Sequence, residues 1–256
     1  MATISPEALA LPLAMALAAG LIGCFAVMRR MTLASDAISH VALPGIGVAL
    51  ALRINPVLGG IVALVVGTVL IWALERRTRL PTDAVIGVVF SAALAIGSML
   101  TSGEELIEAL FGAARRPGSL ETLLGLLGAL LVVAYVLVAR HRLVITQVSG
   151  DLARTVGIDI RRLDLLYLLS FALTVSLGLR FLGVLLMGSL IIIPATTARY
   201  VARSLRGMLT LSVGLAVGAT LLGSLSASIV HLPTGPLTIT IAAGFFLVGL
   251  VWRRRV

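Results

Sequence analysis

Long uncharged runs recur along the chain, and they constrain its fold more than any other feature of the sequence. A helix needs roughly 20 apolar residues to cross about 30 Å of hydrocarbon. Because lipid offers the backbone no hydrogen-bond partners, each run must satisfy its own N–H and C=O groups, as an α-helix does. The sequence therefore predicts membrane-spanning helices in the runs Ala8–Met28, Ile54–Leu74, Ala84–Gly103, Thr122–Ala139, Gly207–Val230 and Leu232–Trp252.

The overall composition agrees with a chain that is largely covered by lipid. Hydrophobic residues make up 59% of the 256 residues, charged residues make up 12%, and the mean hydropathy is +1.14. A soluble domain usually carries about a quarter charged residues. We therefore expect an all-α, polytopic membrane helical bundle of about 8–9 transmembrane helices, with residues 1–256 forming a single transmembrane domain. No basic segment precedes the first run, which favours a retained helix over a cleaved signal peptide.

The distribution of positive charge predicts the orientation of the chain. The net charge is +9, and all 20 basic residues are arginine. Only Arg53, Arg115, Arg116 and Arg180 lie on one side of the predicted spans. The other sixteen lie in alternate loops or at the adjoining helix ends, within residues 29–30, 76–79, 140–162, 199–206 and 253–255. Cytoplasmic loops carry such an excess. The amino terminus is therefore expected outside and the carboxyl terminus in the cytoplasm, and the basicity reflects topology rather than nucleic-acid binding.

The number of spans is least certain between Leu165 and Ala198. Both flanks of this stretch are arginine-rich and should be cytoplasmic, so the chain must enter the membrane and return. Two crossings would share these residues at about 17 each, the short end of the usual range. Arg180, at the midpoint, suits an outer turn. Two short helices fit the stretch, and so does one crossing combined with a re-entrant segment.

Asp36 and His40 are the most informative polar pair. Ionisable side chains within a membrane are costly and usually face a cavity or pathway. Their i, i+4 spacing puts both on one face of a helix. If Arg30 marks the cytoplasmic surface, a rise of 1.5 Å per residue places Asp36 about 9 Å and His40 about 15 Å deep. Imidazole plus carboxylate suits zinc and, with more oxygen donors, manganese. The alternative is an Asp–His ion pair that only holds helices together.

Pro44 adds a backbone argument to this pair. It has no N–H to donate to the carbonyl four residues earlier, which belongs to His40. We therefore expect the helix to kink at Pro44 and free a backbone oxygen beside the imidazole. Irregular backbone at membrane depth is tolerated where it lines a cavity.

Three segments resemble the zinc/manganese ABC permease family. Residues 29–45, RRMTLASDAISHVALPG, resemble its second-helix signature, an arginine-rich turn followed by Asp-x-x-x-His and Leu-Pro-Gly. Residues 181–199, FLGVLLMGSLIIIPATTAR, resemble its run ending Leu-Ile-Ile-Pro-Ala-x-x-Ala-Arg. Residues 232–236, LPTGP, resemble the turn before its last helix. The resemblance covers about Met28 to Leu250 in register.

The resemblance implies a function and a set of partners. Asp36 and His40 would line the route of a transported divalent metal, zinc first and manganese next, with no permanently bound cofactor. The chain would be a homodimeric permease in a bacterial inner membrane. Its partners would be separate ATPase subunits and an extracytoplasmic metal-binding protein, with no nucleic acid.

A cytoplasmic segment resembles the coupling element of the same family. Residues 151–157 have an acidic residue, then Ala153, then Gly157 four residues further on. From the residues alone, the segment is a short amphipathic helix between arginine clusters, ended by Gly157. The resemblance assigns Asp151, Ala153 and Gly157 to coupling with the ATPase, and the alternative is an ordinary solvated loop helix.

The chain departs from the family pattern in two places. His231 stands where the family often has an Asp, at the outer mouth of the last turn, and either hands on metal or is an interfacial histidine with no ligand role. Residues 110–112, Leu-Phe-Gly, lead into Ala113–Pro117 rather than the family's acidic or amide residue and apolar run.

Missing motifs exclude some enzymatic activities. A phosphate-binding Walker A loop needs lysine, and the chain has none. Hydrolysis of ATP is therefore expected on a separate subunit, and the chain itself is not expected to be an enzyme. The His-Glu-x-x-His motif of a metalloprotease is also absent.

Three other functions compete with a metal ABC permease. An ion-gradient-driven transporter would show an inverted internal repeat, and none is evident. A membrane enzyme would need a nucleophile–base or metal-hydrolase motif. An ABC permease for a siderophore or cobalamin would have little use for an Asp–His pair at mid-membrane.

Overall fold

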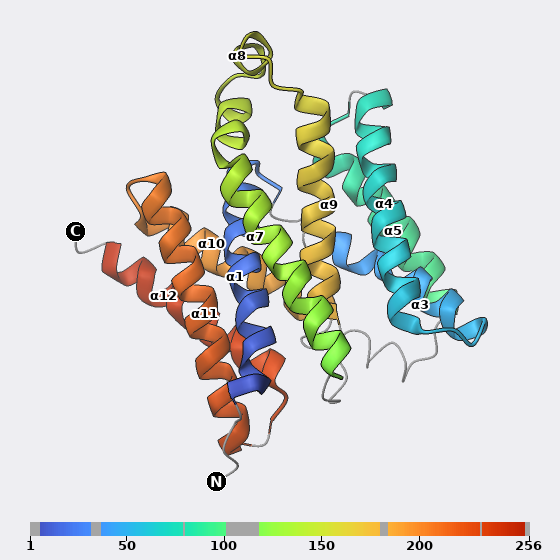
Figure 1. Cartoon of the computed structure of the whole chain (residues 1–256), viewed down its shortest axis with the longest axis vertical. Coiled ribbons are helices and arrows are strands. Elements are labelled where there is room, and N and C mark those ends of the chain that lie inside the picture. Colours follow the sequence, from blue (N-terminus) through green and yellow to red (C-terminus); the bar gives the residue numbers. More distant parts are fainter. Residues whose placement is uncertain are drawn as a thin grey trace.

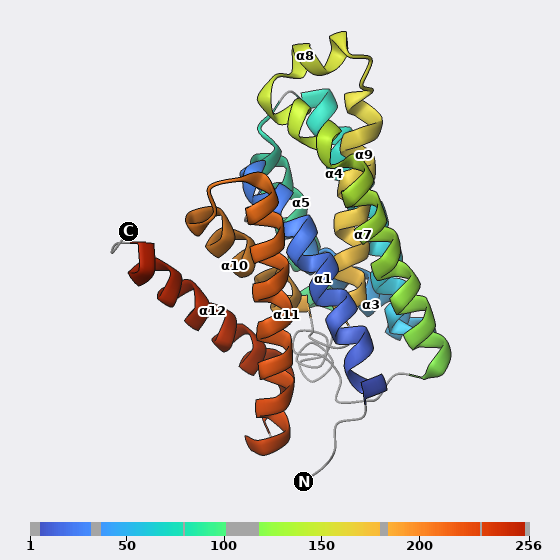
Figure 2. The same cartoon turned by 60° about the vertical axis from the view of Figure 1, so that its left-hand side comes forward.

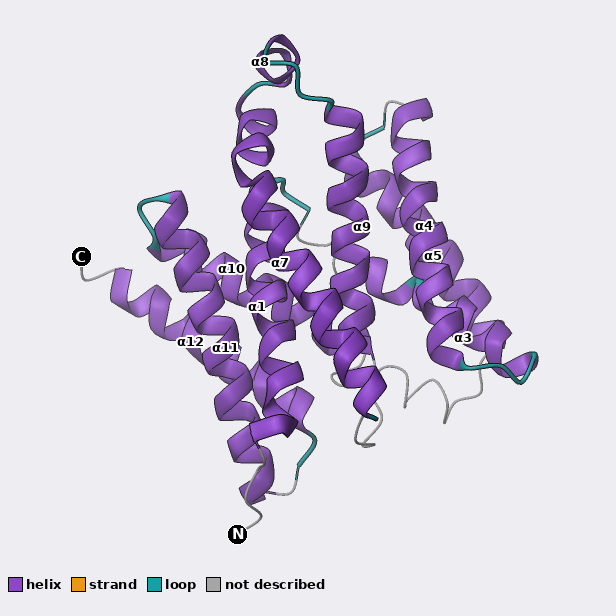
Figure 3. Cartoon of the chain, in the orientation of Figure 1, coloured by secondary structure: helices purple, strands orange, loops and turns teal. Residues whose placement is uncertain are grey.

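The computed structural model describes residues 6–31, 37–78, 80–100, 118–179, 184–230 and 232–253. Every regular element in these ranges is a helix, as predicted (Figure 3). The elements are α1 (Pro6–Met28), α3 (Ala42–Ala51), α4 (Pro56–Thr78), α5 (Thr82–Leu100), α7 (Ser119–Val148), α8 (Gly150–Thr155), α9 (Ile160–Leu179), α10 (Val184–Val201), α11 (Leu205–Val230) and α12 (Thr234–Arg253).

Six helices in the described ranges are long and apolar enough to cross a membrane, namely α1, α4, α5, α7, α11 and α12. This number is below the eight to nine spans predicted, although the prediction of a membrane helical bundle is confirmed. The stretch Leu165–Ala198 contains parts of two further helices, α9 with 20 residues and α10 with 18. It therefore folds as two helices, one of the two arrangements expected. Arg180, between them, lies outside the described residues.

α1 runs through the centre of the molecule, with α7, α9, α10 and α11 packed around it (Figures 1 and 2). Its span is 72% buried within the protein. Small residues permit this close packing, since a methyl group at Gly23 would collide with the carbonyl of Ile191 on α10. We call these five helices the α1 core.

α3, α4 and α5 form a second group, which we call the α3–α5 unit (Figure 1, right). α3 packs on both α4 and α5, and Gly45 of α3 meets the backbone of Gly59 on α4. The main contact between this unit and the α1 core is made by α4 with α9. An apolar groove of about 690 Å³ is lined by residues of α3, α4 and α5.

The arginine-rich segments gather at one end of the bundle. The ends of α1, α4 and α7 meet the starts of α5 and α9 around a polar cavity of about 360 Å³. α8 projects beyond this end, opposite the start of α1 (Figure 1). The last turns of α12 pack on the end of α10, where Gly249 approaches Thr197 and Val201. This arrangement agrees with the common cytoplasmic face predicted from the arginines.

Candidate functional site

His40 lies at a tightened turn of the helical backbone. Residues 37–40 are helical, Val41 forms a turn in which its N–H donates to the carbonyl of Ile38 at 3.0 Å, and α3 begins at Ala42. Val41 keeps right-handed helical backbone angles, with φ −63 and ψ −18, so the helix only tightens by one turn here, and the kink predicted at Pro44 stays a prediction. Pro44 occupies the first turn of α3, where a missing N–H costs no intrahelical hydrogen bond.

The imidazole of His40 packs inside the α3–α5 unit. The side chain is half-buried, and its ring centroid lies 5.4 Å from that of Phe90 on α5, with the planes tilted by 60°. α5 begins at Thr82 beside the polar cavity, and Phe90 is eight residues further along, or about 12 Å at 1.5 Å per residue. His40 is therefore about this far from the arginine-rich end, close to the depth predicted from the sequence.

The other candidate metal ligands fall outside the described residues. Asp36 and His231 both lie there, so their predicted roles stay predictions. Within the described ranges, no group of three or more His, Cys, Asp and Glu side chains is placed to hold a metal ion.

The predicted short helix between the arginine clusters is α8. Ser149 caps its start by accepting a hydrogen bond from the N–H of Leu152 at 3.2 Å. Gly157 ends it at φ +76, with its N–H donating to Arg154 at 3.0 Å while that of Ile158 donates to Ala153 at 2.9 Å. These two bonds form a Schellman motif, whose left-handed residue favours glycine. The left-handed backbone conformation at position 157 therefore explains why a glycine ends α8.

The three residues assigned to coupling have different environments in α8. Ala153 is fully buried and faces the bundle, whereas Asp151 is exposed and pairs with Arg154 at 3.2 Å. A β-carbon at Gly157 would meet no atom within 4 Å, so backbone conformation and not space requires the glycine there.

Sequence reasoning missed an apolar stripe at this protruding tip. Val148, Leu152 and Val156 expose 75%, 50% and 62% of their surfaces, although they lie among charged residues. The four-residue spacing of Leu152 and Val156 was a signal for those two, whereas Val148 ends α7 and is separated from α8 by the extended residue Ser149. Exposed apolar residues on a polar, projecting surface are typical of a protein–protein contact.

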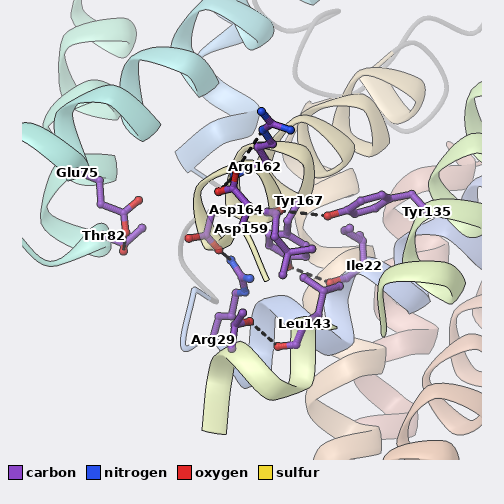
Figure 4. Close-up of polar contacts among 12 residues, drawn as sticks. Ile22, Arg29, Glu75, Thr82, Tyr135, Leu143, Asp159, Arg162, Asp164 and Tyr167 are labelled. Atoms are coloured by element: carbon purple, nitrogen blue, oxygen red, sulfur yellow. Dashed lines mark hydrogen bonds and ion pairs between the residues drawn. The ribbon is translucent and has the colours of Figure 1, made fainter. Parts of the chain in front are cut away.

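Sequence reasoning also missed a polar cluster at the arginine-rich end of the core (Figure 4). Arg29, which follows the last residue of α1, forms an ion pair with Asp164 of α9 at 2.9 Å. Its guanidinium lies 4.5 Å from the ring centroid of Tyr167, and the Tyr167 hydroxyl donates to the carbonyl of Ile22 at 3.2 Å. Asp164 is one of three acidic residues in the arginine-rich segment 140–164, and nothing in the sequence indicated its partner.

Two further hydrogen bonds tie helices together at this end. Arg199 of α10 donates from Nη1 to the carbonyl of Val27 at 2.7 Å, so it satisfies a backbone group at the end of α1. Tyr135 of α7 donates to the carbonyl of Leu163 on α9 at 3.1 Å. Polar contacts therefore join α1 to α10 and α7 to α9 toward the arginine-rich end of the bundle.

Membrane-length helices with a short, capped helix projecting from the arginine-rich end define a polytopic membrane protein. Residues 2–253 match the model of the ABC 3 transport family, and the chain therefore belongs to that family. The resemblance found in the sequence motifs is confirmed.

Characterised members cover most of the chain. The manganese import system permease protein ScaB of Streptococcus gordonii is 30% identical over 90% of this chain and 84% of its own. The high-affinity zinc uptake system membrane protein ZnuB of Haemophilus influenzae is 28% identical over 91% of this chain and 92% of its own. The chelated iron transport system membrane protein YfeD of Yersinia pestis is 32% identical over 91% of this chain and 80% of its own.

Solved structures share the fold. PsaBC from Streptococcus pneumoniae, solved in complex with Fab, superposes with a TM-score of 0.81 and 27% identity over 95% of this chain and 89% of that one. An inward-facing putative metal-chelate type ABC transporter superposes with a TM-score of 0.71 at 18% identity, which is a similarity of fold.

Proposed function

We propose that this chain is the permease subunit of an ATP-driven importer of a divalent transition metal, with zinc the first candidate and manganese the second. The observation that carries this proposal is the near full-length match to relatives named for manganese, zinc and chelated-iron transport. The metal is the transported substrate and not a resident cofactor.

The site proposed for the metal is the Asp36–His40 pair. His40 supplies an imidazole at membrane depth, next to a tightened helical turn and against Phe90. A nitrogen and a carboxylate oxygen form a donor set that suits zinc and, with added oxygens, manganese. A transport site must bind well enough to admit the ion and weakly enough to release it, so few ligands are expected. The second protomer or water would complete the shell, and His231 would hand metal inward from the outer mouth.

The proposed partners follow from the rest of the molecule. With no lysine for a phosphate loop, the chain needs separate ATPase subunits, and α8 offers them a docking surface. Asp151 and the exposed stripe would contact the ATPase, Ala153 would anchor α8 on the bundle, and Gly157 would fix its end. A second copy of the chain would complete the pathway, and an extracytoplasmic binding protein would deliver the metal.

A second candidate function is transport of iron, which one relative's name favours. An ion-gradient-driven mechanism is disfavoured by membership of the ABC 3 transport family.

The test is uptake by a reconstituted complex. The permease is coexpressed with the ATPase and binding protein encoded beside it, placed in liposomes and given zinc, manganese or ferrous iron, with and without ATP. We expect ATP-dependent uptake, strongest for zinc. Uptake driven by a proton gradient without ATP would contradict the ABC mechanism. Stronger uptake of manganese or iron than of zinc would show that zinc is not the preferred substrate.

A further inference from the structure

We propose that Arg29 and Asp164 are positioning residues, and that their ion pair is a latch within the α1 core that sets the position of α9 against α1 and, through the packing of α4 on α9, the position of the α3–α5 unit and His40. The proposal rests on the proposed function, because it assumes that an ATPase acts on α8. It adds a role for two residues that lie far from the metal candidates.

The latch differs from two other ion pairs among the described residues. Arg154–Asp151 and Arg162–Asp159 join residues three apart on one helix, and their side chains are about half to nearly fully exposed. Such surface pairs contribute little to stability. Arg29–Asp164 joins the end of α1 to α9, and its side chains expose only 13% and 31%. Its position between two helices allows it to fix their relative placement.

One side of the latch is firmly held. Arg29 directly follows α1, whose inner half is tied to α10 by the hydrogen bond from Arg199 to Val27. Arg30 then closes the helix at φ +60, and the N–H of Met31 donates to Ala26 at 2.9 Å in a second Schellman motif. Arg29 is therefore a fixed point on the core.

The other side of the latch is connected to the proposed ATPase contact. Asp164 is the fifth residue of α9, and α9 follows α8 after a short link that begins at Gly157. A helix transmits displacement along its axis because its backbone is rigid. A push on α8 therefore reaches Asp164 first and then α4, which packs on α9 and carries the α3–α5 unit.

The surroundings permit the latch to open. The polar cavity of about 360 Å³ lies beside the pair and is also lined by Arg30, Glu75 and Gln147. Separating a buried ion pair usually strands two desolvated charges. Here water and these polar side chains would solvate them, so engaged and disengaged states can be close in free energy. A two-state contact at this place would link the ATPase to His40.

The first test compares uptake with hydrolysis in the reconstituted complex. Asp164→Asn removes the charge and keeps the shape, so we expect metal uptake per ATP hydrolysed to fall about tenfold while assembly and hydrolysis persist. The exchanged pair, Arg29→Asp with Asp164→Arg, should restore part of the metal uptake per ATP hydrolysed. Arg29→Lys, which keeps the charge but loses the planar stacking on Tyr167, should be intermediate. Asp159→Asn, next to the exposed Arg162, is the matched control and should change nothing.

Two outcomes of this test would overturn the latch. One is an unchanged uptake-to-hydrolysis ratio in Asp164→Asn. The other is loss of uptake in proportion to loss of assembled complex, with no recovery in the exchanged pair, which would show a merely structural contact.

A second measurement does not depend on the transported metal. Spin labels at Thr155→Cys on α8 and Met99→Cys on α5 report the distance between the tip and the α3–α5 unit; Met99 is 85% exposed and the native Cys24 is buried. Nucleotide should shift this distance in the otherwise native complex and not in Asp164→Asn. An equal shift in both would contradict the latch. If the shift behaves as expected but no metal is transported, the proposed substrate fails and the latch stands.

Discussion

The α1 core and the α3–α5 unit are both apolar, yet they are packed differently. The span of α1 is 72% buried, whereas those of α4 and α5 are each 28% buried, although α4 is the more apolar helix. Burial in a bilayer follows close-packing small residues rather than hydropathy, since lipid is as apolar as leucine. α1 carries Gly20, Gly23 and several fully buried alanines. The flanking core helices α7 and α11 are only 28% and 22% buried, so the close packing centres on α1, which is suited to be the scaffold of the core.

The two regions also differ in their polar contacts. In the core, Ser212 donates to Gly20 at 2.8 Å, and Tyr167 and Arg199 make similar bonds to the α1 backbone. In the described part of the α3–α5 unit, Thr82 of α5 donates to Glu75 of α4 at 2.6 Å, and Ser91 and Ser98 bond within α5. The α3–α5 unit, which carries the candidate metal residue His40, contacts the core mainly through α4 and α9, and a unit held at one side in this way is suited to move.

The largest effect is expected at the candidate metal residues of the α3–α5 unit. His40→Ala and Asp36→Ala should each reduce metal uptake by at least about 100-fold, because loss of a direct ligand exceeds the usual cost of losing its supporting contacts. His40→Gln should fare little better, because an amide is a poor substitute for imidazole toward zinc. His141→Ala, on the exposed surface of α7, is the matched control and should transport normally.

The thermal stability and assembly of these variants show whether Asp36 and His40 bind metal or form only a structural ion pair. A structural ion pair would strand a buried charge when one partner is removed, and the complex would collapse. Uptake by the native complex should also fall as the pH drops, because imidazole and carboxylate bind metal only when unprotonated. Near-normal uptake by either alanine variant would exclude the metal site.

The second effect tests the close packing of the core. Gly23→Ala should lower the free energy of unfolding by about 1–3 kcal/mol, since its methyl group would press on the Ile191 carbonyl. Gly87→Ala on α5, where a β-carbon meets nothing within 4 Å, should be neutral or slightly stabilising. Thermal unfolding in detergent measures both. Equal destabilisation of the two variants would contradict the close contact between α1 and α10 at Gly23.

The third effect concerns the end of α8. Gly157→Ala should strain the left-handed turn by about 1–2 kcal/mol and weaken copurification with the ATPase. Gly157→Asn should be milder, because asparagine tolerates this conformation. Gly150→Ala, in ordinary contact with Ile160 at 3.9 Å, is the control. Unchanged assembly and transport in Gly157→Ala would count against a coupling role.

The smallest effect compares single hydroxyl groups. Ser212→Ala removes a buried bond between α11 and α1 and should cost about 1 kcal/mol. Ser91→Ala removes an exposed bond to Gly87 within α5 and should have no measurable effect. The difference in unfolding temperature between the two variants measures the polar cross-linking of the core.

The sequence predicted those features that depend on solvent or on neighbours along the chain. Apolar runs of membrane length predicted the helices, and the arginines predicted the shared end. Gly157 predicted the end of α8, because the Schellman motif is a local structure. The kink predicted at Pro44 stays a prediction, since the structure shows a tightened helical turn at Val41 and Pro44 in the first turn of α3.

Contacts between distant segments could not be predicted. Hydropathy indicates that a helix lies in an apolar environment but not whether lipid or other helices surround it. The sequences of α1 and α4 therefore looked alike although their burial differs. Spacing relates residues on one helix only, so nothing paired Arg29 with Asp164 or His40 with Phe90. These contacts require the three-dimensional arrangement of the helices.

The most direct test of the account is X-ray absorption at the zinc edge of the purified complex loaded with zinc. We predict a shell that contains imidazole nitrogen at about 2.0–2.1 Å together with oxygen donors. His40→Ala should remove the imidazole contribution, and His141→Ala should leave it intact. A zinc spectrum that is the same in His40→Ala as in the native complex would contradict the proposal that His40 binds the transported metal.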